Sequence, residues 1–363
     1  MNRLHVIWQR DLSRGRYRDG GSDPGGAPSV YPREYEWICD LLRGFSLVHH
    51  PDGHFSTAIP GSVVVLEGQN YDVRSVRRYL RRFSRSGCRT EGVGLIHITD
   101  EFGKAPVEVY ADAFFVYRNY WRAEIDRWDH CHYLPLGSNC PRDLFSPVPL
   151  AERPYRWSFA GQRKVSRTAM IEALEARADG KLIATSSFNS GLSKEAYAQL
   201  LSNTQVVLCP RGWASVETYR FYEALDAGAV PLVEDDGGLD LLREHRSRDA
   251  LRRMLASGPR AWVDFARRIP RGSYWGHAYG ASFPCPRIFR WENVHRVIDT
   301  LDIARLQEKT SRWWRRYVRD LRIHIQDSVR ASLGIEPSPD SDSSSVPREG
   351  IARRLPVSGR SRL

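Results

Sequence analysis

Residues 206–233 read VVLCPRGWASVETYRFYEALDAGAVPLV, and this stretch decides the fold prediction. Its first apolar residues predict a buried strand that ends at Cys209, after which Pro210 and Gly212 force a loop. Helical spacing follows, and then a second apolar run of the strand type. A strand, a loop, a helix and another strand in this order are typical of a parallel α/β sheet. The predicted elements are a strand at 205–208, a helix at 216–227 with Ser215 as its N-cap and Gly228 at its end, and a strand at 230–233.

The same alternation of strands and helices extends outward from this stretch over most of the chain. A loop-like segment with several prolines, at 137–156, divides the pattern in two. We therefore expect an α/β fold with two Rossmann-like domains, at 1–150 and 151–330, and a disordered tail rich in Ser, Pro and charge at 331–363. The remaining strands are expected at 4–8, 45–49, 62–66, 92–98, 114–117, 132–136, 156–160 and 181–184, and the helices at 31–43, 73–83, 167–178, 193–202 and 301–330.

The composition shows that the chain is positively charged and supports few other conclusions. The 363 residues carry 54 Lys and Arg against 43 Asp and Glu, which gives a net charge of +11. This length favours two domains of ordinary size, and the positive charge favours anionic partners such as phosphorylated ligands, acidic lipids or nucleic acid. The six cysteines form no CxxC pair, so the common zinc and thioredoxin signatures are absent and reduced, mostly buried thiols are expected.

The prediction of the cellular location rests on two features that were not found in the sequence, a membrane-spanning segment and a signal peptide. No apolar run approaches the ~18 residues that cross a bilayer, and the first ten residues are too polar for a signal peptide. The sequence therefore favours a cytoplasmic protein, with peripheral contact at an anionic membrane as a further expectation. A Golgi-lumenal catalytic fragment that lacks its anchor is the alternative.

The loop after Cys209 is a candidate phosphate site. A loop that leaves the carboxyl end of a parallel strand and leads into a helix points backbone N–H groups and the helix dipole at an anion. Arg211 adds a positive fork suited to a diphosphate, and Glu223 is a carboxylate that can accept from the two hydroxyls of a ribose. The spacing of Glu217, Arg220 and Glu223 also fits a surface ladder of ion pairs, and spacing alone favours that interpretation.

A second candidate loop follows the first strand of the predicted second domain. It carries Gly161, Gln162, Lys164 and Arg167. A glycine-containing loop between a strand and a helix can approach a diphosphate closely, with Lys164 or Arg167 as phosphate partners. A plain turn with solvated cations fits the same residues equally well.

Two pieces of the sequence between residues 209 and 235 resemble a segment of a known protein family. The sequence CPRG at 209–212 and ETYRFYEALDAGAVPLVED at 217–235 resemble the donor-binding segment of the exostosin family, glycosyltransferase family 47, and within it the ribitol xylosyltransferase-like branch. The resemblance covers roughly residues 60–320. Its other pieces, in the order of the family, are IHITDE at 96–101, FVYRNYW at 115–121, YLPLG at 133–137, FAGQ at 159–162, WENV at 291–294 and LQEKTSRWW at 306–314.

The resemblance implies a fold and an activity. The fold is GT-B, with two Rossmann-like domains that face each other across a cleft. The activity is inverting transfer of a sugar from a nucleotide donor, usually UDP-linked, to a glycan or polysaccharide acceptor, without a bound metal or other cofactor, because the helix dipole and basic side chains stabilise the leaving diphosphate. The implied donor-binding residues are Arg211, Gly212, Ser215, Glu217, Arg220 and Glu223, together with Gly161, Gln162, Lys164 and Arg167.

The catalytic base is expected in the first domain, at Asp100 or Glu101. Both follow the predicted strand at 92–98, and ligands of an open α/β sheet collect at the carboxyl ends of its strands. A carboxylate at that edge can take the proton of an acceptor hydroxyl. Position alone also fits Asp100 as the cap of a local turn, and His97 fits a core histidine.

Other motifs support no further site. The histidine clusters at 49–54 and 129–132 have no known metal-ligand spacing, so no metal is predicted, and the glycine-rich segment 20–26 is not a P-loop. The cations and aromatics at 312–322 fit nucleic acid, an anionic membrane or, preferably, a packed terminal helix. The alternatives to a transferase are therefore a basic nucleic-acid-binding protein, which lacks any further motif and is not favoured, and a non-catalytic glycan-binding relative.

Overall fold

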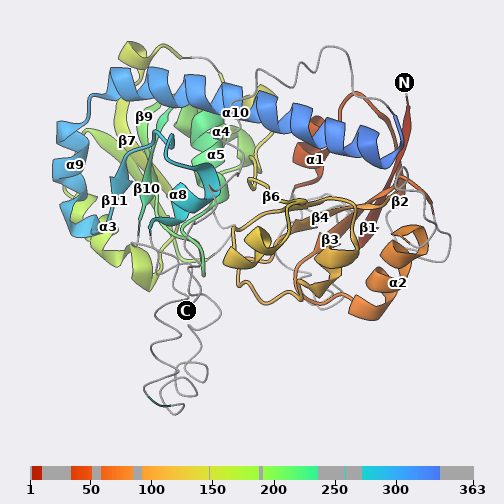
Figure 1. The fold of residues 1–363 in the computed structure, drawn as a ribbon. Coiled ribbons are helices and arrows are strands. Elements are labelled where there is room, and N and C mark those ends of the chain that lie inside the picture. The colour runs from red at the N-terminus through yellow and green to blue at the C-terminus, as the bar shows by residue number, and fades with distance from the viewer. Residues whose placement is uncertain are drawn as a thin grey trace, which may run out of the picture.

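The computed structural model describes residues 2–9, 34–50, 59–84, 92–146, 148–187, 191–235, 258 and 272–335. Within them the chain forms two parallel sheets with helices packed against them (Figure 1). The six-stranded sheet has the order β2-β1-β3-β4-β5-β6, and the five-stranded sheet has the order β11-β10-β9-β7-β8. Every strand pair in both sheets is parallel. The fold class is therefore α/β with two Rossmann-like domains of the GT-B type, as predicted.

The first sheet is built from the first 133 residues. Two of its strands, β3 and β4, are almost wholly buried, as expected where helices cover both faces of a parallel sheet. Its elements are β1 (Arg3–Gln9), α1 (Tyr35–Leu41), β2 (Ser46–His50), β3 (Val63–Glu67), α2 (Val73–Ser84), β4 (Gly94–Ile98), the 3₁₀ helix η2 (Glu108–Asp112), β5 (Val116–Arg118), η3 (Ala123–Arg127) and β6 (Cys131–Tyr133), and the connection to the second sheet holds η4 (Arg142–Leu144) and η5 (Leu150–Glu152).

The second sheet is a layer between two groups of helices. Along β9, Val206 and Leu208 pack in a core cluster with α3 and α9, whereas Val207 and Cys209 pack in another with α5 and α10. Because successive side chains of a strand point to opposite faces, β9 must be apolar throughout. The elements are β7 (Tyr155–Gln162), η6 (Val165–Arg167), α3 (Thr168–Leu174), β8 (Gly180–Thr185), α4 (Lys194–Ser202), β9 (Thr204–Cys209), α5 (Tyr219–Asp226), β10 (Val230–Glu234), α8 (Tyr274–Tyr279), β11 (Arg287–Ile288), η8 (Trp291–Asn293), α9 (Val294–Thr300) and α10 (Ile303–Ser332).

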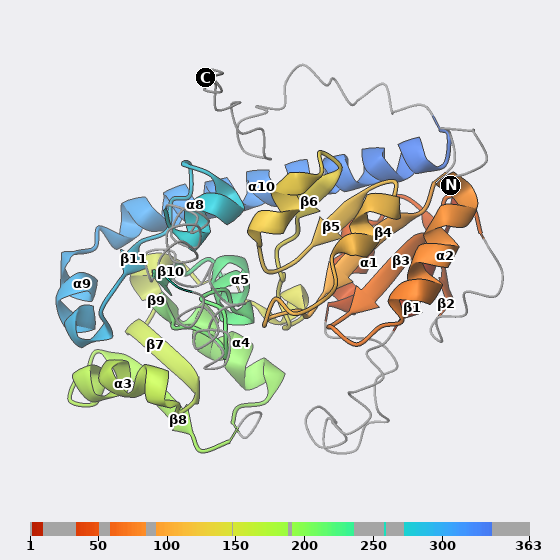
Figure 2. The same cartoon turned by 60° about the horizontal axis from the view of Figure 1, so that its bottom comes forward.

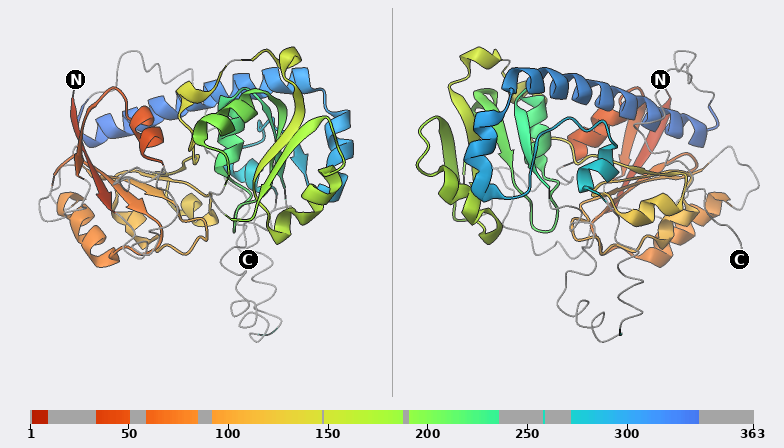
Figure 3. Two further views of the ribbon diagram at one scale, coloured as in Figure 1. Left: turned by 180° about the vertical axis from the view of Figure 1, so that it is seen from behind. Right: turned by 60° about the vertical axis from the view of Figure 1, so that its left-hand side comes forward.

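Helix α10 lies along both sheets (Figures 1 and 2). Near its start, Trp314 Nε1 donates to Asp226 at the end of α5 over 2.9 Å. Near its end, Arg322 pairs with Asp40 of α1 at 2.7 Å, and the backbone N–H of Gly92 donates to Ser332 O over 3.0 Å. The back view in Figure 3 shows the same continuous helix beside both sheets. The helix therefore joins the two domains, and the predicted boundary at residue 150 stays a prediction.

The start of α5 differs from the prediction. The helix begins at Tyr219 instead of residue 216, because residues 212–215 close a tight turn in which Gly212 N donates to Ser215 O over 2.7 Å. Ser215 Oγ accepts from Glu217 N at 3.0 Å inside the following loop. Ser215 is therefore a turn residue, the prediction that it caps the helix is wrong, and Thr218 occupies the N-cap position.

Some predictions concern residues outside the described ranges. The tail from residue 336, the glycine-rich segment 20–26, Cys88 and part of the histidine cluster at 49–54 lie there. In the described part of the chain, no helix is long and apolar enough to cross a membrane. The cysteines described by the structure are free thiols, at Cys39, Cys131, Cys140, Cys209 and Cys285.

Candidate active site at the facing edges of the two sheets

The strand order of the second sheet fixes where a ligand fits. Counted along the chain from β7, its order is 2-1-3-4-5, the doubly wound order in which ligands bind beside the point where successive connections diverge. That point lies at the carboxyl ends of β7 and β9. The loops that leave these two strands are the two candidate loops of the sequence, at 161–167 and 210–215, so the fold brings them together.

A carboxylate of the first domain reaches this point. Glu101 follows β4, and its Oε1 accepts from the backbone N–H groups of Trp213 at 2.7 Å, Ala214 at 2.9 Å and Ser215 at 3.3 Å. A Cβ on Gly212 would lie 2.5 Å from the same oxygen, so the lack of a side chain at this position makes room for the carboxylate where it lies. We call the three N–H groups the 213–215 nest, because successive backbone donors that converge on one anion form such a concavity.

Three cations of the second domain lie beside the nest. Lys164 Nζ is 3.8 Å from the centroid of the Trp213 indole ring. Arg167 is 5% exposed and donates to Gln162 O at 3.0 Å and to Arg211 O at 2.8 Å. Arg220 donates to Ala160 O at 2.7 Å, and a Cβ on Gly161 would lie 2.6 Å from its Nη2. The glycine thus allows the guanidinium to approach the backbone closely. We call Lys164, Arg167 and Arg220 the cation cluster.

Some hydrogen-bond donors of the cation cluster have no acceptor in the described structure. Among the described residues, Nε of Arg167 and Nε of Arg220 are buried and have no hydrogen-bond partner. Burial and the neighbouring Arg167 lower the pKa of Lys164 to about 8, and burial together with Arg220 lowers the pKa of Arg167. An anion bound here would satisfy the donors and relieve the repulsion between the cations.

Arg211 lies differently from the prediction. Its Nε pairs with Glu234 at the end of β10, and its backbone N–H donates to the same carboxylate at 3.0 Å. Trp291 Nε1 donates to Glu234 as well, at 2.9 Å. The guanidinium of Arg211 is therefore held by a carboxylate of its own domain. A contact of Arg211 with a diphosphate stays a prediction.

Glu217 is a buried anchor between the domains. It is 1% exposed, and it accepts from the hydroxyls of Tyr133, Tyr222 and Tyr274 and from Leu136 N. Tyr133 and Leu136 come from the end of the first sheet and the segment that follows it. Its carboxylate is engaged inside the protein, and a contact of Glu217 with the donor stays a prediction.

Glu223 is also buried, at 6% exposed, and accepts from Tyr197 of α4 at 3.0 Å. Burial raises the pKa of its carboxyl. Since Glu217 and Glu223 are both buried, the alternative of a surface ladder of ion pairs is wrong. A role of Glu223 with ribose hydroxyls stays a prediction.

Asp100 is a structural carboxylate. It is 3% exposed, pairs with Arg118 at 2.8 Å, and accepts from the backbone N–H groups of Lys104 and Ala105 at 2.9 and 3.1 Å. Burial alone would raise the pKa of its carboxyl, but the charge and hydrogen bond of Arg118 outweigh it, so the pKa lies below its ordinary value. A carboxylate so held is a poor proton acceptor, and the turn-capping interpretation of Asp100 is the correct one.

His97 is the core histidine that its strand position indicates. It is fully buried, its Nε2 donates to Gly68 O at 2.7 Å, and its Nδ1 accepts from the Tyr110 hydroxyl at 2.5 Å. Burial lowers the pKa of its imidazole to about 4. The ring is therefore neutral at neutral pH and is hydrogen-bonded on both nitrogens.

The first-domain edge holds functional signs that the sequence did not reveal. Thr99 and Tyr120, which follow β4 and β5, have positive φ angles of 63° and 56°, which is rare for side chains of these types. Among the described residues, Thr99 Oγ1 and Asn119 Nδ2 are buried without hydrogen-bond partners. On the facing edge, Gln162 Oε1 and Thr218 Oγ1 have the same property. Backbone strain and unsatisfied polar atoms thus gather where the two sheets meet.

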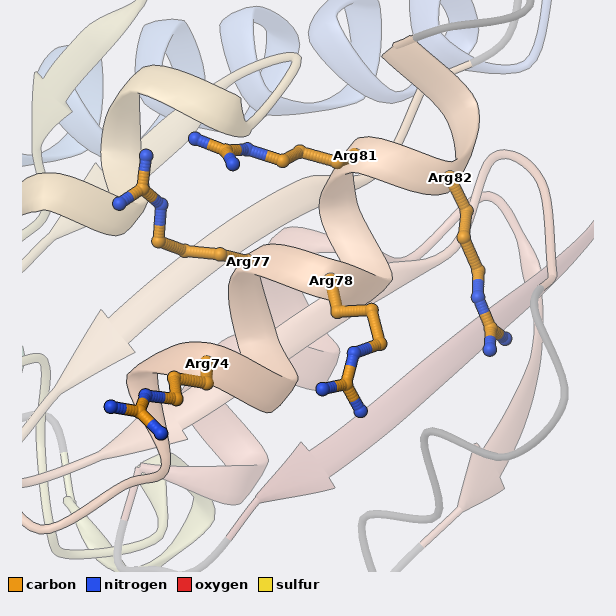
Figure 4. Close-up of a pocket in the computed structure, with 5 residues that line it drawn as sticks. All are labelled: Arg74, Arg77, Arg78, Arg81 and Arg82. Atoms are coloured by element: carbon orange, nitrogen blue, oxygen red, sulfur yellow. The ribbon is translucent and has the colours of Figure 1, made fainter.

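A separate basic surface lies on helix α2. Figure 4 shows its arginines Arg74, Arg77, Arg78, Arg81 and Arg82 around a shallow pocket, and the arginine stripe is our name for these five residues. Asp112 holds Arg77 at 2.7 Å and Arg81 at 2.9 Å. The other three are exposed and recur every four residues, so they lie along one side of the helix. In the described part of the chain, no group of three or more His, Cys, Asp or Glu side chains is arranged to hold a metal ion.

Comparison with known proteins places the similarity in the second domain. A family model described as the RXYLT1 C-terminal domain matches residues 146–257. Human ribitol-5-phosphate xylosyltransferase 1 is 31% identical over 139 residues, which cover 34% of this chain and 29% of the human protein. The mouse protein of the same name is 34% identical over the same share of each chain. This chain thus matches less than a third of the length of either relative.

Among solved structures, the crystal structure of an alpha1,3-fucosyltransferase aligns with 85% of this chain and 90% of its own chain, at 11% identity and a TM-score of 0.34. That score is too low to add to the argument on the fold, which rests on the two sheets themselves. The matched segment 146–257 holds the 213–215 nest and the whole cation cluster. The part of this chain that builds the second side of the candidate site is therefore similar to the C-terminal domain of ribitol-5-phosphate xylosyltransferase 1.

Proposed function

We propose that the chain is an inverting, metal-independent glycosyltransferase of the exostosin type that takes its sugar from a nucleotide donor, UDP-linked by resemblance. One observation carries the proposal. A carboxylate of the first domain, Glu101, meets a backbone anion nest and a cation cluster of the second domain at the ligand-binding edge of a doubly wound sheet. The first domain thus contributes a carboxylate that can act as the base, and the second domain contributes the site for the diphosphate.

The donor diphosphate belongs to the second domain in this proposal. The phosphate oxygens would accept from the 213–215 nest and pair with Lys164, Arg167 and Arg220, which together supply the positive charge that a metal ion provides in other transferases. Gly161 and Gly212 allow this close approach of backbone and ligand. Gln162, whose Oε1 is buried without a partner in the described structure, is a further donor contact.

The chemistry follows from the two sides of the site. Glu101 accepts the proton of an acceptor hydroxyl, and the oxygen of that hydroxyl attacks the anomeric carbon from the face opposite the diphosphate. The bond between that carbon and the phosphate oxygen breaks, and the diphosphate leaves with the electron pair, stabilised by the N–H groups and the cation cluster. Inversion requires that base and leaving group lie on opposite faces, which fits carboxylate and cations from different domains.

The acceptor belongs to the first domain and is a glycan or other hydroxyl compound. The arginine stripe supports an acceptor that carries negative charge, because exposed Arg74, Arg78 and Arg82 leave a row of positive charge on this domain. The name of the similar xylosyltransferases refers to ribitol 5-phosphate, so a phosphate-bearing polyol is the acceptor class we propose. The net charge of +11 also supports peripheral contact with an anionic membrane, in the cytoplasm or in the Golgi lumen.

A panel of nucleotide sugars tests the proposal. Donors that bind should raise the melting temperature, and with a phosphorylated polyol or glycan acceptor one donor should yield product of inverted anomeric configuration, in EDTA as well as with manganese. If no nucleotide sugar stabilises the protein or is turned over, the proposal is wrong. Stabilisation by single-stranded DNA instead would identify a nucleic-acid-binding protein, and glycan binding without turnover would identify a non-catalytic relative.

A further inference from the structure

The carboxylate of Glu101 lies where an anionic ligand would lie. A single oxygen, Oε1, accepts from three successive backbone N–H groups of another domain, 112 to 114 residues further along the chain. Convergent backbone donors of this kind are the usual cradle of a phosphate oxygen. A Cβ on Gly212 would lie 2.5 Å from this oxygen, and it would come equally close to a phosphate oxygen in the same place.

The surroundings of the nest suit a larger anion than one carboxylate. Lys164, Arg167 and Arg220 supply three positive charges. Glu101 acts on this cluster together with Glu234, which is already paired with Arg211, and Glu223, which accepts from Tyr197. The buried Nε of Arg167 and of Arg220 have no hydrogen-bond partner in the described structure, although Glu101 already occupies the nest. A diphosphate has enough oxygens to fill the nest and to reach both guanidinium groups.

Occupancy of the nest by Glu101 and by a phosphate is mutually exclusive. The Oε1 atom is 2.7 Å from Trp213 N and 2.9 Å from Ala214 N, which is full hydrogen-bond contact, so no second oxygen can accept from the same donors in the same position. A phosphate oxygen therefore has to displace the carboxylate before it enters.

The segment around Glu101 allows that movement. The preceding residue, Asp100, is fixed by Arg118 and by two backbone donors. The backbone is thus anchored one residue away, so the displacement is expected as a rotation of the Glu101 side chain.

We propose that Glu101 is an internal competitor for the phosphate site: it closes the 213–215 nest in the empty protein and is displaced by the diphosphate of the donor. The inference rests on the proposed function for the identity of that diphosphate. Displacement also releases the base next to the donor sugar at the moment when the donor has arrived. The empty protein therefore holds its base inactive, and binding of the donor itself makes the base available to an acceptor hydroxyl.

The test measures the affinity of the full chain for inorganic pyrophosphate and for UDP by titration calorimetry. Glu101→Ala removes the competitor, so both ligands should bind about tenfold more tightly or better, since apparent affinity scales with the fraction of protein whose site is open. Equal affinity in the wild-type protein and Glu101→Ala would overturn the proposal. Weaker binding in Glu101→Ala would overturn it as well, because Glu101 would then assist the ligand.

The variant Glu101→Asp separates the effect of the contact with the nest from the effect of the negative charge. The shorter side chain keeps the negative charge at the same backbone position and does not reach the nest, so it should bind pyrophosphate as tightly as Glu101→Ala. If Glu101→Asp instead binds pyrophosphate only as tightly as the wild-type protein, the higher affinity of Glu101→Ala arises from the loss of a negative charge near the site. The proposal of an internal competitor is then disproved. Thermal melts of both variants check that they fold.

Pyrophosphate also separates this inference from the proposed function. If pyrophosphate binding depends on Glu101 as described but no nucleotide sugar is turned over, the proposed function fails and the competitor stands. If sugar transfer is observed but no variant of Glu101 changes pyrophosphate affinity, the competitor fails and the proposed function stands. Gly212→Ala, made in the Glu101→Ala background, places a Cβ in a nest that no side chain occupies, and it should weaken pyrophosphate binding relative to Glu101→Ala alone. Unchanged binding in this double variant would show that the ligand does not use the nest, which also overturns the proposal.

Discussion

Asp100 and Arg118 form an ion pair of 2.8 Å in which the two side chains are 2% and 1% exposed. Arg118 also donates to the Tyr110 hydroxyl at 2.8 Å, and that hydroxyl contacts His97. The pair thus sits in a buried polar network beneath the facing edge of the first sheet. Asp100 therefore holds the backbone next to Glu101, the residue that we propose as the base.

Asp100→Ala should destabilise the protein strongly. Removal of one partner leaves the Arg118 guanidinium buried without its counter-ion, which costs about 3–5 kcal/mol in comparable pairs. The half-exposed arginines on Asp112 provide the control, and Asp112→Ala should cost about 1 kcal/mol or less. Urea unfolding measures both. Because the folded pKa of Asp100 is lowered, its contribution is present above the unfolded pKa near 3.8 and is lost as the pH falls through the folded value.

Lys164 should give donor binding a pH dependence. Its pKa is about 8 in the empty protein, so the ammonium is charged at neutral pH and becomes neutral as the pH rises through 8. UDP affinity should therefore be constant between pH 7 and 7.5 and fall above pH 8, with the phosphate itself ionised above about pH 6. Lys164→Met should bind more weakly and show no such fall. A wild-type affinity that stays level to pH 10 would remove Lys164 from the site.

Arg220→Ala should weaken UDP binding by about 1.5–3 kcal/mol, the usual cost of a lost charge-assisted hydrogen bond. Arg211→Ala is the contrasting variant. It should mainly lower the melting temperature, because it leaves Glu234 without its ion-pair partner. Calorimetry and thermal melts of both variants separate the roles, and the reverse pattern would restore Arg211 as the principal phosphate ligand.

Glu101→Gln should separate binding from turnover. The amide cannot accept a proton, so kcat should fall by about 10²–10⁴, while UDP binds at least as tightly as to the wild-type protein. Initial rates with a saturating donor give kcat directly. A variant that retains the wild-type rate would place the base elsewhere on the first-domain edge.

Charge reversal on the arginine stripe should raise the KM for an anionic acceptor. Arg78→Glu combined with Arg82→Glu changes the charge of the stripe by four units and touches no residue of the donor site, so UDP affinity should stay unchanged. Arg296→Glu, on exposed α9 of the other domain, is the control. The KM effect should shrink at high salt, since exposed charges are screened there. Equal KM values in all three proteins would exclude the stripe as an acceptor surface.

The sequence predicted the elements of the fold better than the contacts between them. Apolar runs such as 62–66 and 205–208 locate β3 and β9 to within about one residue. A strand that is buried on both faces of its sheet has apolar side chains throughout, so it is easy to recognise in the sequence. Helix α5 begins later in the chain than predicted, because Gly212 and Ser215 form a tight turn before it. Ser215 Oγ accepts from Glu217 N inside the loop and does not cap the helix. Arg118, the ion-pair partner of Asp100, and Tyr133 and Tyr274, which donate to Glu217, lie in other segments, and residue spacing along one helix or strand does not reveal them.

The continuous helix α10 has a thermodynamic consequence for the molecule. Its N-terminal half is hydrogen-bonded to the second domain through Asp226, and its C-terminal half to the first domain through Asp40 and Gly92. Neither sheet can lose its structure without exposing one end of a helix that the other sheet needs. The two domains are therefore expected to melt in a single cooperative transition, with one calorimetric peak instead of two.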